Sequence, residues 1–387
     1  MKTSILQDNK TKNTKIFQSE LTIESPGRIN LIGEHTDYNN GHVLPAAIDK
    51  KITLNFRKNN QQQTCNIYSE NYNSHFQINL KNLKRSNTEW ENYILGVVNE
   101  IIIRRPDQIK GFDCVIKSEL PIGAGISSSA ALECGIAKGI NLLFDLGLSD
   151  IDIIELSRNA EHTYVGTNCG IMDQFAVTKG EKSKIILLNC KTLESKLINA
   201  NFSPYKIVLL NTNVSHSLST SAYNDRREEC KKALELISKE FHPKLTSLVD
   251  IPEEILSTFK DKIPEKLFNR AIYITQENRR VINAVESLKK NDLKEFGKFL
   301  YQSHEGLQHL YEVSCTELDF LVDFSRNFDS VIGSRMMGGG FGGCTINLIH
   351  QNNIDDYIKR ASIAYKKKFS ISLTPIIVSI SNGVSKK

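Results

Sequence analysis

FDCVIKSELPIGAGISSSAALECGIAKGINLLFDLG, residues 112–147, changes character twice along its length. Residues 112–120 form an apolar run typical of a strand, and the residues after 131 have the apolar spacing of a helix. The loop between them, PIGAGISSSAA, is rich in small residues, so backbone N–H groups can approach an anion at the start of a helix. Three serines, 127–129, add hydroxyls for a phosphate or a metal ion. The pattern predicts a phosphate cradle; the alternative is a capped helix after a turn, because serine is a favoured N-cap.

Neither of the common glycine-rich nucleotide motifs fits the chain. The loop at 121–131 lacks the lysine of the P-loop GxxxxGK[ST]. GGGFGG at 338–343 matches GxGxxG, but the strand-like CTINLI follows it, whereas a dinucleotide site needs a helix there. We expect 338–343 to be a flexible loop that packs against another backbone segment or a phosphate site.

Strand and helix patterns alternate loosely along both halves of the chain. Strand patterns cover 51–57, 64–69, 184–190, 205–213 and 371–380, and helical patterns cover 151–164, much of 222–327, and 354–369. We expect an α+β protein of two lobes with mixed sheets. The segment 191–204 contains the expected boundary, which divides the chain into domains 1–195 and 196–387. The tail, 381–387, is expected to fray.

Composition narrows the class of protein. A formal net charge of +5 over 387 residues, with Lys mixed among Glu and Asp, does not predict nucleic-acid binding. No run approaches the ~18 apolar residues that cross a bilayer, and the polar N-terminus does not resemble a secretory signal. The eight cysteines form no CxxC pair and do not bunch with histidines, so a zinc site is not expected. We expect a cytoplasmic protein with reduced thiols.

A second unusual stretch, SPGRINLIGEHTDYNNGHVLP at 25–45, crowds an arginine, a glutamate, two histidines and an aspartate among three glycines. Such a loop suits a polar ligand, because its glycines let the backbone turn sharply. Asp173, alone among apolar and small residues in GIMDQF, is either a helix cap or a functional group. Arg28 could be the cation that lowers its pKa, although nothing in the sequence shows that the two meet.

Other polar residues have ordinary interpretations when they are taken singly. Glu161 fits a solvated carboxylate on a helix, and Tyr223 fits an amphipathic tyrosine at a helix start. We expect His216 and His304 to be hydrogen-bonded structural histidines, with no catalytic role.

Taken together, these motifs resemble the galactokinase family of the GHMP kinase superfamily. GRINLIGEHTDYNNG looks like the galactokinase signature, and PIGAGISSSAALE resembles the superfamily's ATP-binding motif. NCGIMDQF, AYNDRR, SHEGLQHLYEVSCTELD and MMGGGFGGCTINL follow in the family's order. The resemblance spans roughly residues 20 to 350. Ile126 stands where leucine is common, and Met337 and Gly339 vary the usual wording of the glycine loop.

The resemblance implies a fold, a reaction and a pathway. The N-terminal domain would be similar to a ribosomal S5 domain 2-type fold and the C-terminal domain would be ferredoxin-like, with the active site between them. The protein would transfer phosphate from ATP, with Mg²⁺, to the anomeric hydroxyl of α-D-galactose. The products would be galactose 1-phosphate and ADP, the first step of the Leloir pathway. It would work without nucleic acid or membrane, as a monomer.

The family's functional residues fall on this chain as follows. Asp173 falls on the catalytic base and Arg28 on the residue that stabilises the transition state. The other implied roles are sugar binding (Glu34, His35, Thr36, Asp37, Asp173, Tyr223), nucleotide binding (Ser69, Gly123, Ala124, Gly125, Ile126, Ser127, Ser128, Ser129, and the residues near Trp90) and magnesium binding (Ser129, Glu161). Two alternatives stay open: a related kinase for N-acetylgalactosamine or arabinose, and a non-catalytic galactose sensor.

Overall fold

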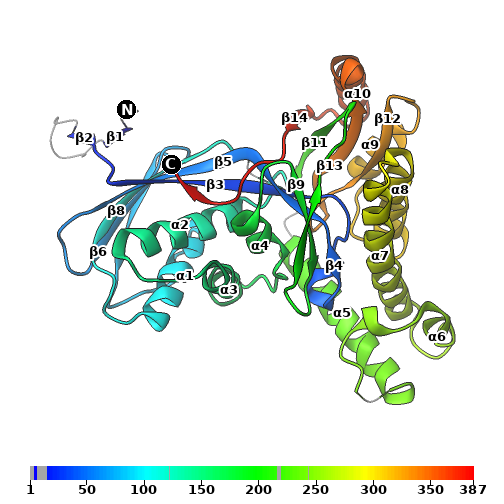
Figure 1. Ribbon diagram of the computed structural model, residues 1–387, viewed down its shortest axis with the longest axis horizontal. Helices are drawn as coiled ribbons and strands as arrows, with labels where there is room; N and C mark the ends of the chain where they lie inside the picture. The colour runs from blue at the N-terminus through cyan, green and yellow to red at the C-terminus, as the bar shows by residue number, and fades with distance from the viewer. Residues whose placement is uncertain (1–3, 7–14, 122, 216–218, 243) are drawn as a thin grey trace.

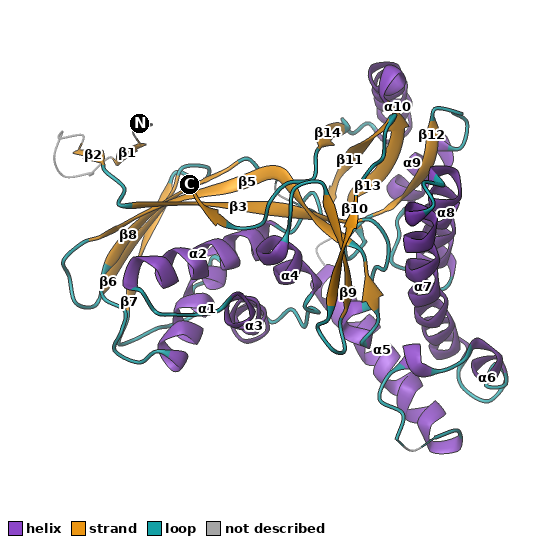
Figure 2. Cartoon of the chain, in the orientation of Figure 1, coloured by secondary structure: helices purple, strands orange, loops and turns teal. Residues whose placement is uncertain are grey.

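The computed structural model describes residues 4–6, 15–121, 123–215, 219–242 and 244–387, and divides into two lobes, each built on its own sheet (Figure 1). The first lobe holds a six-stranded sheet and the helices α1 to α4, and the second holds a four-stranded sheet and α5 to α10 (Figure 2). No helix in these described ranges is long and apolar enough to cross a membrane.

The sheet of the first lobe has the strand order β15-β3-β5-β8-β6-β7. All neighbouring strands are antiparallel except β6 and β8, which are parallel. The strands are β3 (Leu21–Asn30), β5 (Pro45–Lys58), β6 (Thr64–Ser69), β7 (Ser74–Asn79), β8 (Phe112–Ser118) and β15 (Ser385–Lys386). A short pair, β1 (Ser4–Leu6) with β2 (Lys15–Phe17), precedes them.

Four helices cover one face of this sheet: α1 (Glu89–Arg104), α2 (Ser128–Phe144), α3 (Asp150–Ala160) and α4 (Met172–Lys179). Helix α2 lies directly on β3 and β5 because its glycines remove side chains from the contact. A Cβ on Gly135 would lie 2.6 Å from Leu54, and one on Gly139 would lie 2.2 Å from the Phe56 ring. The predicted helix 151–164 is α3 followed by a π-helical turn, η2 (Glu161–Val165), a feature often found at functional sites.

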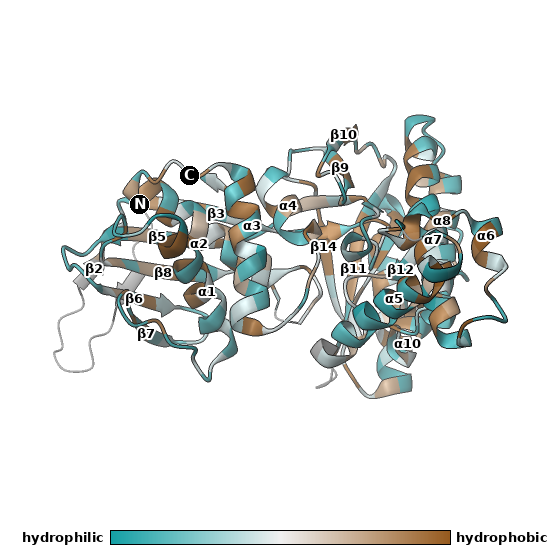
Figure 3. Ribbon diagram, turned by 90° about the horizontal axis from the view of Figure 1, so that it is seen from below, coloured by the Kyte–Doolittle hydropathy of each residue, from teal (hydrophilic) through white to brown (hydrophobic). Residues whose placement is uncertain are grey.

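The second lobe has a fully antiparallel sheet of order β12-β13-β11-β14: β11 (Tyr205–Ser215), β12 (Val331–Met336), β13 (Gly342–His350) and β14 (Thr374–Val378). Its helices are α5 (Ser219–Glu240), α6 (Glu253–Ser257), α7 (Glu265–Lys289), α8 (Leu293–His309), α9 (Thr316–Ser325) and α10 (Ile354–Phe369). Hydrophobic and hydrophilic residues are mixed along α5, α7 and α8, as expected of helices with one buried face (Figure 3). Short 3-10 turns are η1 (Asp37–Asn39), η3 (Leu248–Asp250) and η4 (Gln351–Asn353).

A third, small sheet lies where the lobes meet and has the order β10-β9-β4: β4 (His42–Val43), β9 (Lys184–Asn189) and β10 (Ser195–Asn199). The segment expected to contain the domain boundary, 191–204, therefore includes a strand that forms a hairpin with β9. The domain boundary at residue 195 stays a prediction.

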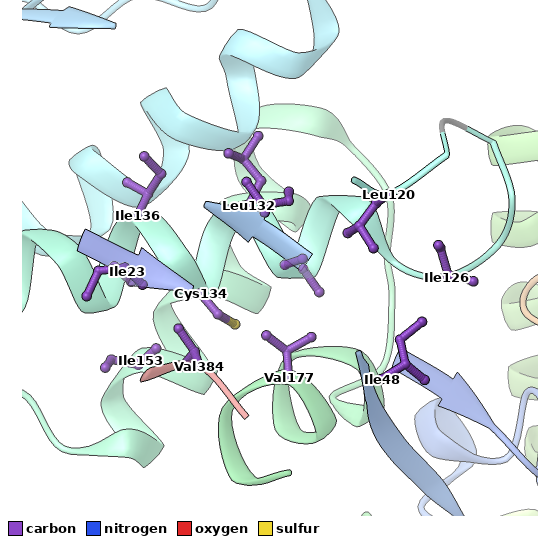
Figure 4. Packing of buried hydrophobic residues seen from close by; sticks show 14 of the residues in the cluster. Ile23, Ile48, Leu120, Ile126, Leu132, Cys134, Ile136, Ile153, Val177 and Val384 are labelled. Carbon is purple, nitrogen blue, oxygen red and sulfur yellow. The ribbon is translucent and has the colours of Figure 1, made fainter. Parts of the chain in front are cut away.

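The C-terminal tail does not fray, contrary to the expectation. It returns to the first lobe, where β15 pairs with β3 and the Val384 N–H donates to the Val177 carbonyl at 2.8 Å. Figure 4 shows the Val384 side chain beside Val177, Ile23 and Cys134 in the core of that lobe. Burial of Val384 explains the order of a segment whose polar composition indicates none.

Candidate active site

Arg28 and Asp173 form a two-bond ion pair where the lobes meet. Arg28 Nε and Nη2 donate to the two carboxylate oxygens of Asp173 at 2.7 and 2.8 Å, and Nη1 donates to the Gly125 carbonyl at 2.7 Å. Arg28, on β3, is buried, and Asp173 lies in the first turn of α4. Although burial opposes charge on Arg28, the carboxylates of Asp173 and Glu34 raise its pKa above the usual value. Asp173 is therefore an ion-paired carboxylate and makes no side-chain cap bond at the start of α4, so of the two interpretations the structure does not support the helix cap.

The loop before α2 leaves the first N–H groups of that helix without a side-chain cap in the part of the chain that the structure describes. Gly123 and Gly125 adopt φ of +72° and +69°, and Ser127 at the N-cap position has φ 54°. The Ser127 hydroxyl donates to Asp173 and makes no bond to the first turn of α2. The first backbone N–H groups of α2 thus have no side-chain cap, which leaves them available to an anion.

The glycine loop at 338–343 packs on this loop, as expected. A Cβ on Gly338 would lie 3.3 Å from the Gly125 carbonyl oxygen, and one on Gly125 would lie 3.2 Å from the Met337 oxygen. Strand β13 begins within the glycine loop at Gly342, so no helix follows it. The exclusion of a dinucleotide fingerprint is confirmed.

The loop that joins β3 to β4 carries four of the predicted sugar ligands. Glu34 is 2% exposed, and its Oε1 accepts from the Gly338 N–H at 2.8 Å and from Arg335 at 3.0 Å, both in the second lobe. The Thr36 hydroxyl contacts the carbonyls of Gly33 and His42 at 2.8 and 2.7 Å. Its hydroxyl is therefore engaged in closing the loop itself.

Asp37, His35 and Tyr223 lie around the same space. A Cβ on Gly170 would lie 1.9 Å from Asp37 Oδ2, so the loop before α4 can approach this carboxylate only as glycine. Burial, together with the charge of Asp173, raises the pKa of Asp37 to about 7. The ring of Tyr223 on α5 lies 5.3 Å from the His35 ring, centroid to centroid. Residues from β3, the 33–41 loop, α4 and α5 thus converge on one site.

Glu161 lies near Asp173 and belongs to a second carboxylate group. Gln174 Nε2 donates to Glu161 Oε2 at 3.0 Å and to Glu133 Oε2 at 3.2 Å. Burial and the charge of Asp173 raise the pKa of Glu161 to about 7, and burial and Glu161 raise that of Glu133 well above its usual range. The sequence interpretation of Glu161 as a solvated carboxylate is wrong, because its side chain is buried.

The donor set of Ser129 and Glu161 fits a magnesium ion. Mg²⁺ prefers oxygen ligands and keeps several waters, so one hydroxyl and one carboxylate suffice. Ser129 lies in the first turn of α2, and Glu161 Oε1 makes no hydrogen bond in the part of the chain that the structure describes. A divalent cation would also offset the repulsion among Glu161, Glu133 and Asp173. No group of three or more His, Cys, Asp or Glu in the described ranges could hold a metal on its own.

The predicted adenine side of the site contains an aromatic group. Trp90, in the first turn of α1, stacks on Tyr72 with centroids 5.4 Å apart and contacts Phe76 edge-on. The buried Ser69 ends β6 beside this group, and its hydroxyl accepts from the Tyr72 N–H at 3.4 Å. The structure thus brings Ser69 and Trp90, both predicted on the nucleotide side, together through Tyr72, which the sequence interpretation had not named.

Sequence reasoning also missed Arg335, Gln174 and Glu133. Gln174 stands next to Asp173, and Glu133 interrupts an apolar helix. An acid or an amide at a position expected in the core was the sequence signal that could have identified both residues as buried polar groups. His304 accepts from the Met336 N–H at 3.3 Å and faces Asp319, as expected of a structural histidine. His216 lies outside the described residues.

The small-residue loop before α2, the Arg28–Asp173 ion pair and the two sheets together indicate a GHMP kinase. The family model "GHMP kinases N terminal domain" matches residues 92–181, and "GHMP kinases C terminal" matches 284–367. The "Galactokinase galactose-binding signature" matches residues 13–58. A crystal structure of Methanococcus jannaschii mevalonate kinase shares the fold, with a TM-score of 0.66 at 20% identity over 94% of this chain and 99% of that one.

Comparison with similar proteins places the chain in one family of GHMP kinases. Galactokinase of Thermosipho africanus is 42% identical over 366 residues, which cover 95% of this chain and 99% of the relative. That of Clostridium tetani is 44% identical over 346 residues, 89% of this chain and 87% of the relative. The crystal structure of Lactococcus lactis galactokinase complexed with galactose has a TM-score of 0.91 at 34% identity, over 95% of both chains. The chain belongs to the galactokinase family, which confirms the expected family, fold and sugar-kinase class.

Proposed function

We propose that the protein transfers the γ-phosphoryl group of ATP to the anomeric hydroxyl of α-D-galactose, giving galactose 1-phosphate and ADP. The observation that carries this proposal is that Arg28 donates hydrogen bonds both to Asp173 and to the Gly125 carbonyl. These bonds connect a carboxylate base to the phosphate loop, residues 123–129, in a site lined by side chains suited to binding sugar hydroxyls. The family membership of the chain supports the same reaction.

Asp173 accepts the proton of the anomeric hydroxyl. A general base must be held in position, and the guanidinium of Arg28 fixes both carboxylate oxygens of Asp173. The Ser127 hydroxyl donates to the same carboxylate, so a hydrogen bond connects the base to the loop before α2. Arg28 also offsets negative charge as the phosphoryl group transfers.

ATP binds along the loop from Gly123 to Ser129. The uncapped N–H groups at the start of α2 face the phosphates, and the adenine lies toward Ser69 and Trp90. Ser129 and Glu161 would hold Mg²⁺, which would neutralise charge on the phosphates. Gln174 orients the Glu161 carboxylate for this task.

The site discriminates among sugars because each of its polar side chains pairs with a particular sugar hydroxyl. The second lobe engages one oxygen of Glu34, which leaves its other oxygen for a sugar hydroxyl. Asp37, His35 and Tyr223 complete the site, and Thr36 holds the loop in shape. An epimer that leaves one of these buried groups unpaired loses ~1–3 kcal/mol of binding.

The protein works as a monomer in the cytoplasm. All eight cysteines are free thiols, which suits a reducing compartment. Light scattering of the purified protein measures the oligomeric state, and fractionation of the source cell tests the location.

The experiment measures ADP release with ATP and Mg²⁺ across galactose, 2-deoxygalactose, N-acetylgalactosamine, glucose and arabinose. We expect the highest kcat/KM on galactose. Asp173→Asn should keep sugar binding and lose at least ~10³-fold in kcat. Lys179→Ala, at the exposed end of the same helix, is the matched control. Galactose binding without ADP release overturns the kinase in favour of a sensor, and preference for another sugar reassigns the substrate.

A further inference from the structure

Four polar side chains form a chain of close contacts from the 33–41 loop, the proposed sugar loop, into the second lobe. The His35 Nδ1 atom lies 2.8 Å from the Tyr38 hydroxyl, which lies 2.8 Å from the Tyr311 hydroxyl. The Tyr311 hydroxyl in turn lies 3.1 Å from the Cys230 sulfur on α5. His35, Tyr311 and Cys230 are all at least 97% buried. The proposed reaction requires only the first member of this chain.

The donor and acceptor roles of the four groups depend on one another. Each hydroxyl has a single proton, so the group that donates at one end decides which atom donates at every later step. If the Cys230 thiol donates, Tyr311 donates to Tyr38, and Tyr38 donates to His35 Nδ1. The ring proton of a neutral His35 then sits on Nε2. If Nδ1 donates instead, every bond reverses and Nε2 becomes an acceptor.

The surroundings of the two ends are compatible with the first direction. Burial raises the pKa of the Cys230 thiol to about 11, so the sulfur keeps a proton that it can donate to Tyr311. At the other end, burial and the guanidinium of Arg226 lower the pKa of His35 to about 3, so the ring is neutral with one proton.

The remaining ring nitrogen is available for a ligand. His35 Nε2 is buried and has no hydrogen-bond partner of good geometry in the described structure. Gly339 lies nearby, and its backbone raises the pKa of His35, as a carbonyl that faces an N–H does. A buried donor without a partner costs about 1–3 kcal/mol, and a sugar oxygen placed there removes this penalty.

We propose that Cys230, Tyr311 and Tyr38 are positioning residues that form a relay, which holds His35 with its proton on Nε2 and makes it a hydrogen-bond donor to the sugar. The identity of that sugar as galactose rests on the proposed function. The relay makes the site selective for ligands that place an acceptor oxygen at Nε2, and it extends sugar recognition to α5 and to the turn after α8.

The relay is tested by NMR of the full chain labelled with ¹⁵N-histidine, with the His35 signals assigned through a His35→Gln variant. Long-range ¹H–¹⁵N correlations distinguish a protonated ring nitrogen from an unprotonated one. We expect a single form with the proton on Nε2. A proton on Nδ1 overturns the proposal. This readout needs no turnover, so it stands apart from any failure of the proposed reaction.

Tyr38→Phe keeps the ring and removes the donor to Nδ1. We expect both ring forms to be populated and the galactose KM to rise about tenfold, with kcat within about twofold of wild type. Tyr365→Phe, which removes a buried hydroxyl that donates to the Thr212 carbonyl at 2.8 Å elsewhere in the second lobe, is the control. A Tyr38→Phe protein with one ring form and an unchanged galactose KM overturns the relay.

Cys230→Met and Cys230→Leu test whether the relay extends to the thiol. The two side chains are similar in volume, so both crowd the site equally, but only methionine offers a sulfur that accepts and cannot donate. We expect methionine to move part of the ring proton to Nδ1 and leucine to leave it on Nε2. Identical NMR signals for the two variants overturn a relay that reaches Cys230.

Discussion

Arg335 on β12 donates a hydrogen bond to Glu34 at 3.0 Å, although the two residues lie 301 positions apart in sequence. Both side chains are almost completely buried, and the other donors of Arg335 go to the carbonyls of Asn30, Leu31 and Met336. A strand of the second lobe's sheet is therefore hydrogen-bonded to the end of β3 and to the 33–41 loop of the first lobe. A buried pair of this kind adds little net stability, but loss of one partner leaves a buried charge.

Arg335→Met should lower the free energy of unfolding by about 3–5 kcal/mol, because it leaves the Glu34 carboxylate buried and unpaired. Urea denaturation measures the change. The double variant Arg335→Met with Glu34→Gln should recover part of this loss, since the remaining group is neutral. Equal stability of the single and double variants contradicts the coupling.

Gln174→Met should raise the Mg²⁺ concentration for half-maximal activity by about five- to tenfold, because Glu161 and Glu133 lose the amide that both accept from. The galactose KM should stay within about twofold, because within the described ranges the Gln174 side chain bonds to Glu133, Glu161 and Cys169 and to none of the proposed sugar ligands. Binding of Mn²⁺ with a non-hydrolysable ATP analogue, followed by electron paramagnetic resonance, gives a readout independent of turnover. Gln351→Met, on the exposed η4 turn, is the control, and an unchanged metal titration contradicts the role of Gln174.

Asp37→Asn should change how stability depends on pH. The folded protein keeps a proton on Asp37 up to a pH of about 7, its raised pKa, whereas the unfolded chain releases it near 4. The folded state binds more protons across that window, so Asp37 makes the wild type less stable as the pH rises from about 4 to about 7. The variant should gain roughly 2–3 kcal/mol relative to wild type between pH 5 and pH 7.5. Chemical denaturation without sugar measures this, and a constant difference contradicts it.

Removal of residues 381–387 should lower the free energy of unfolding by about 2–4 kcal/mol and reduce kcat severalfold. The tail buries Val384, and its backbone donates to the carbonyls of Val177 and Gly180, at the end of the helix that carries Asp173. Calorimetry and steady-state kinetics measure the two effects.

The matched control for this truncation is Lys387→Ala. It removes only an exposed ion pair with Glu24 at 3.1 Å, which should cost less than about 1 kcal/mol. A truncated protein as stable as the Lys387→Ala variant shows that the tail does not hold α4.

Features encoded by neighbouring residues could be predicted from the chain alone. The strand, loop and helix of 112–147 were predicted because apolar spacing and small residues act within a few positions. The same holds for the glycine loop followed by a strand, and for the crowding of Glu34, His35 and Asp37 in one turn. These motifs also sufficed to predict the family. Local chemistry thus determined what kinds of group the site contains.

Tertiary structure decided which groups meet. Arg28 and Asp173 are 145 residues apart, and no local pattern distinguishes a paired aspartate from a helix cap. The burial of Glu161, the shared amide of Gln174 and the order of the tail likewise depend on how α2, α4 and the sheets pack together. An ion pair or a buried amide depends on distance in space and on the exclusion of water, and only the folded chain sets both.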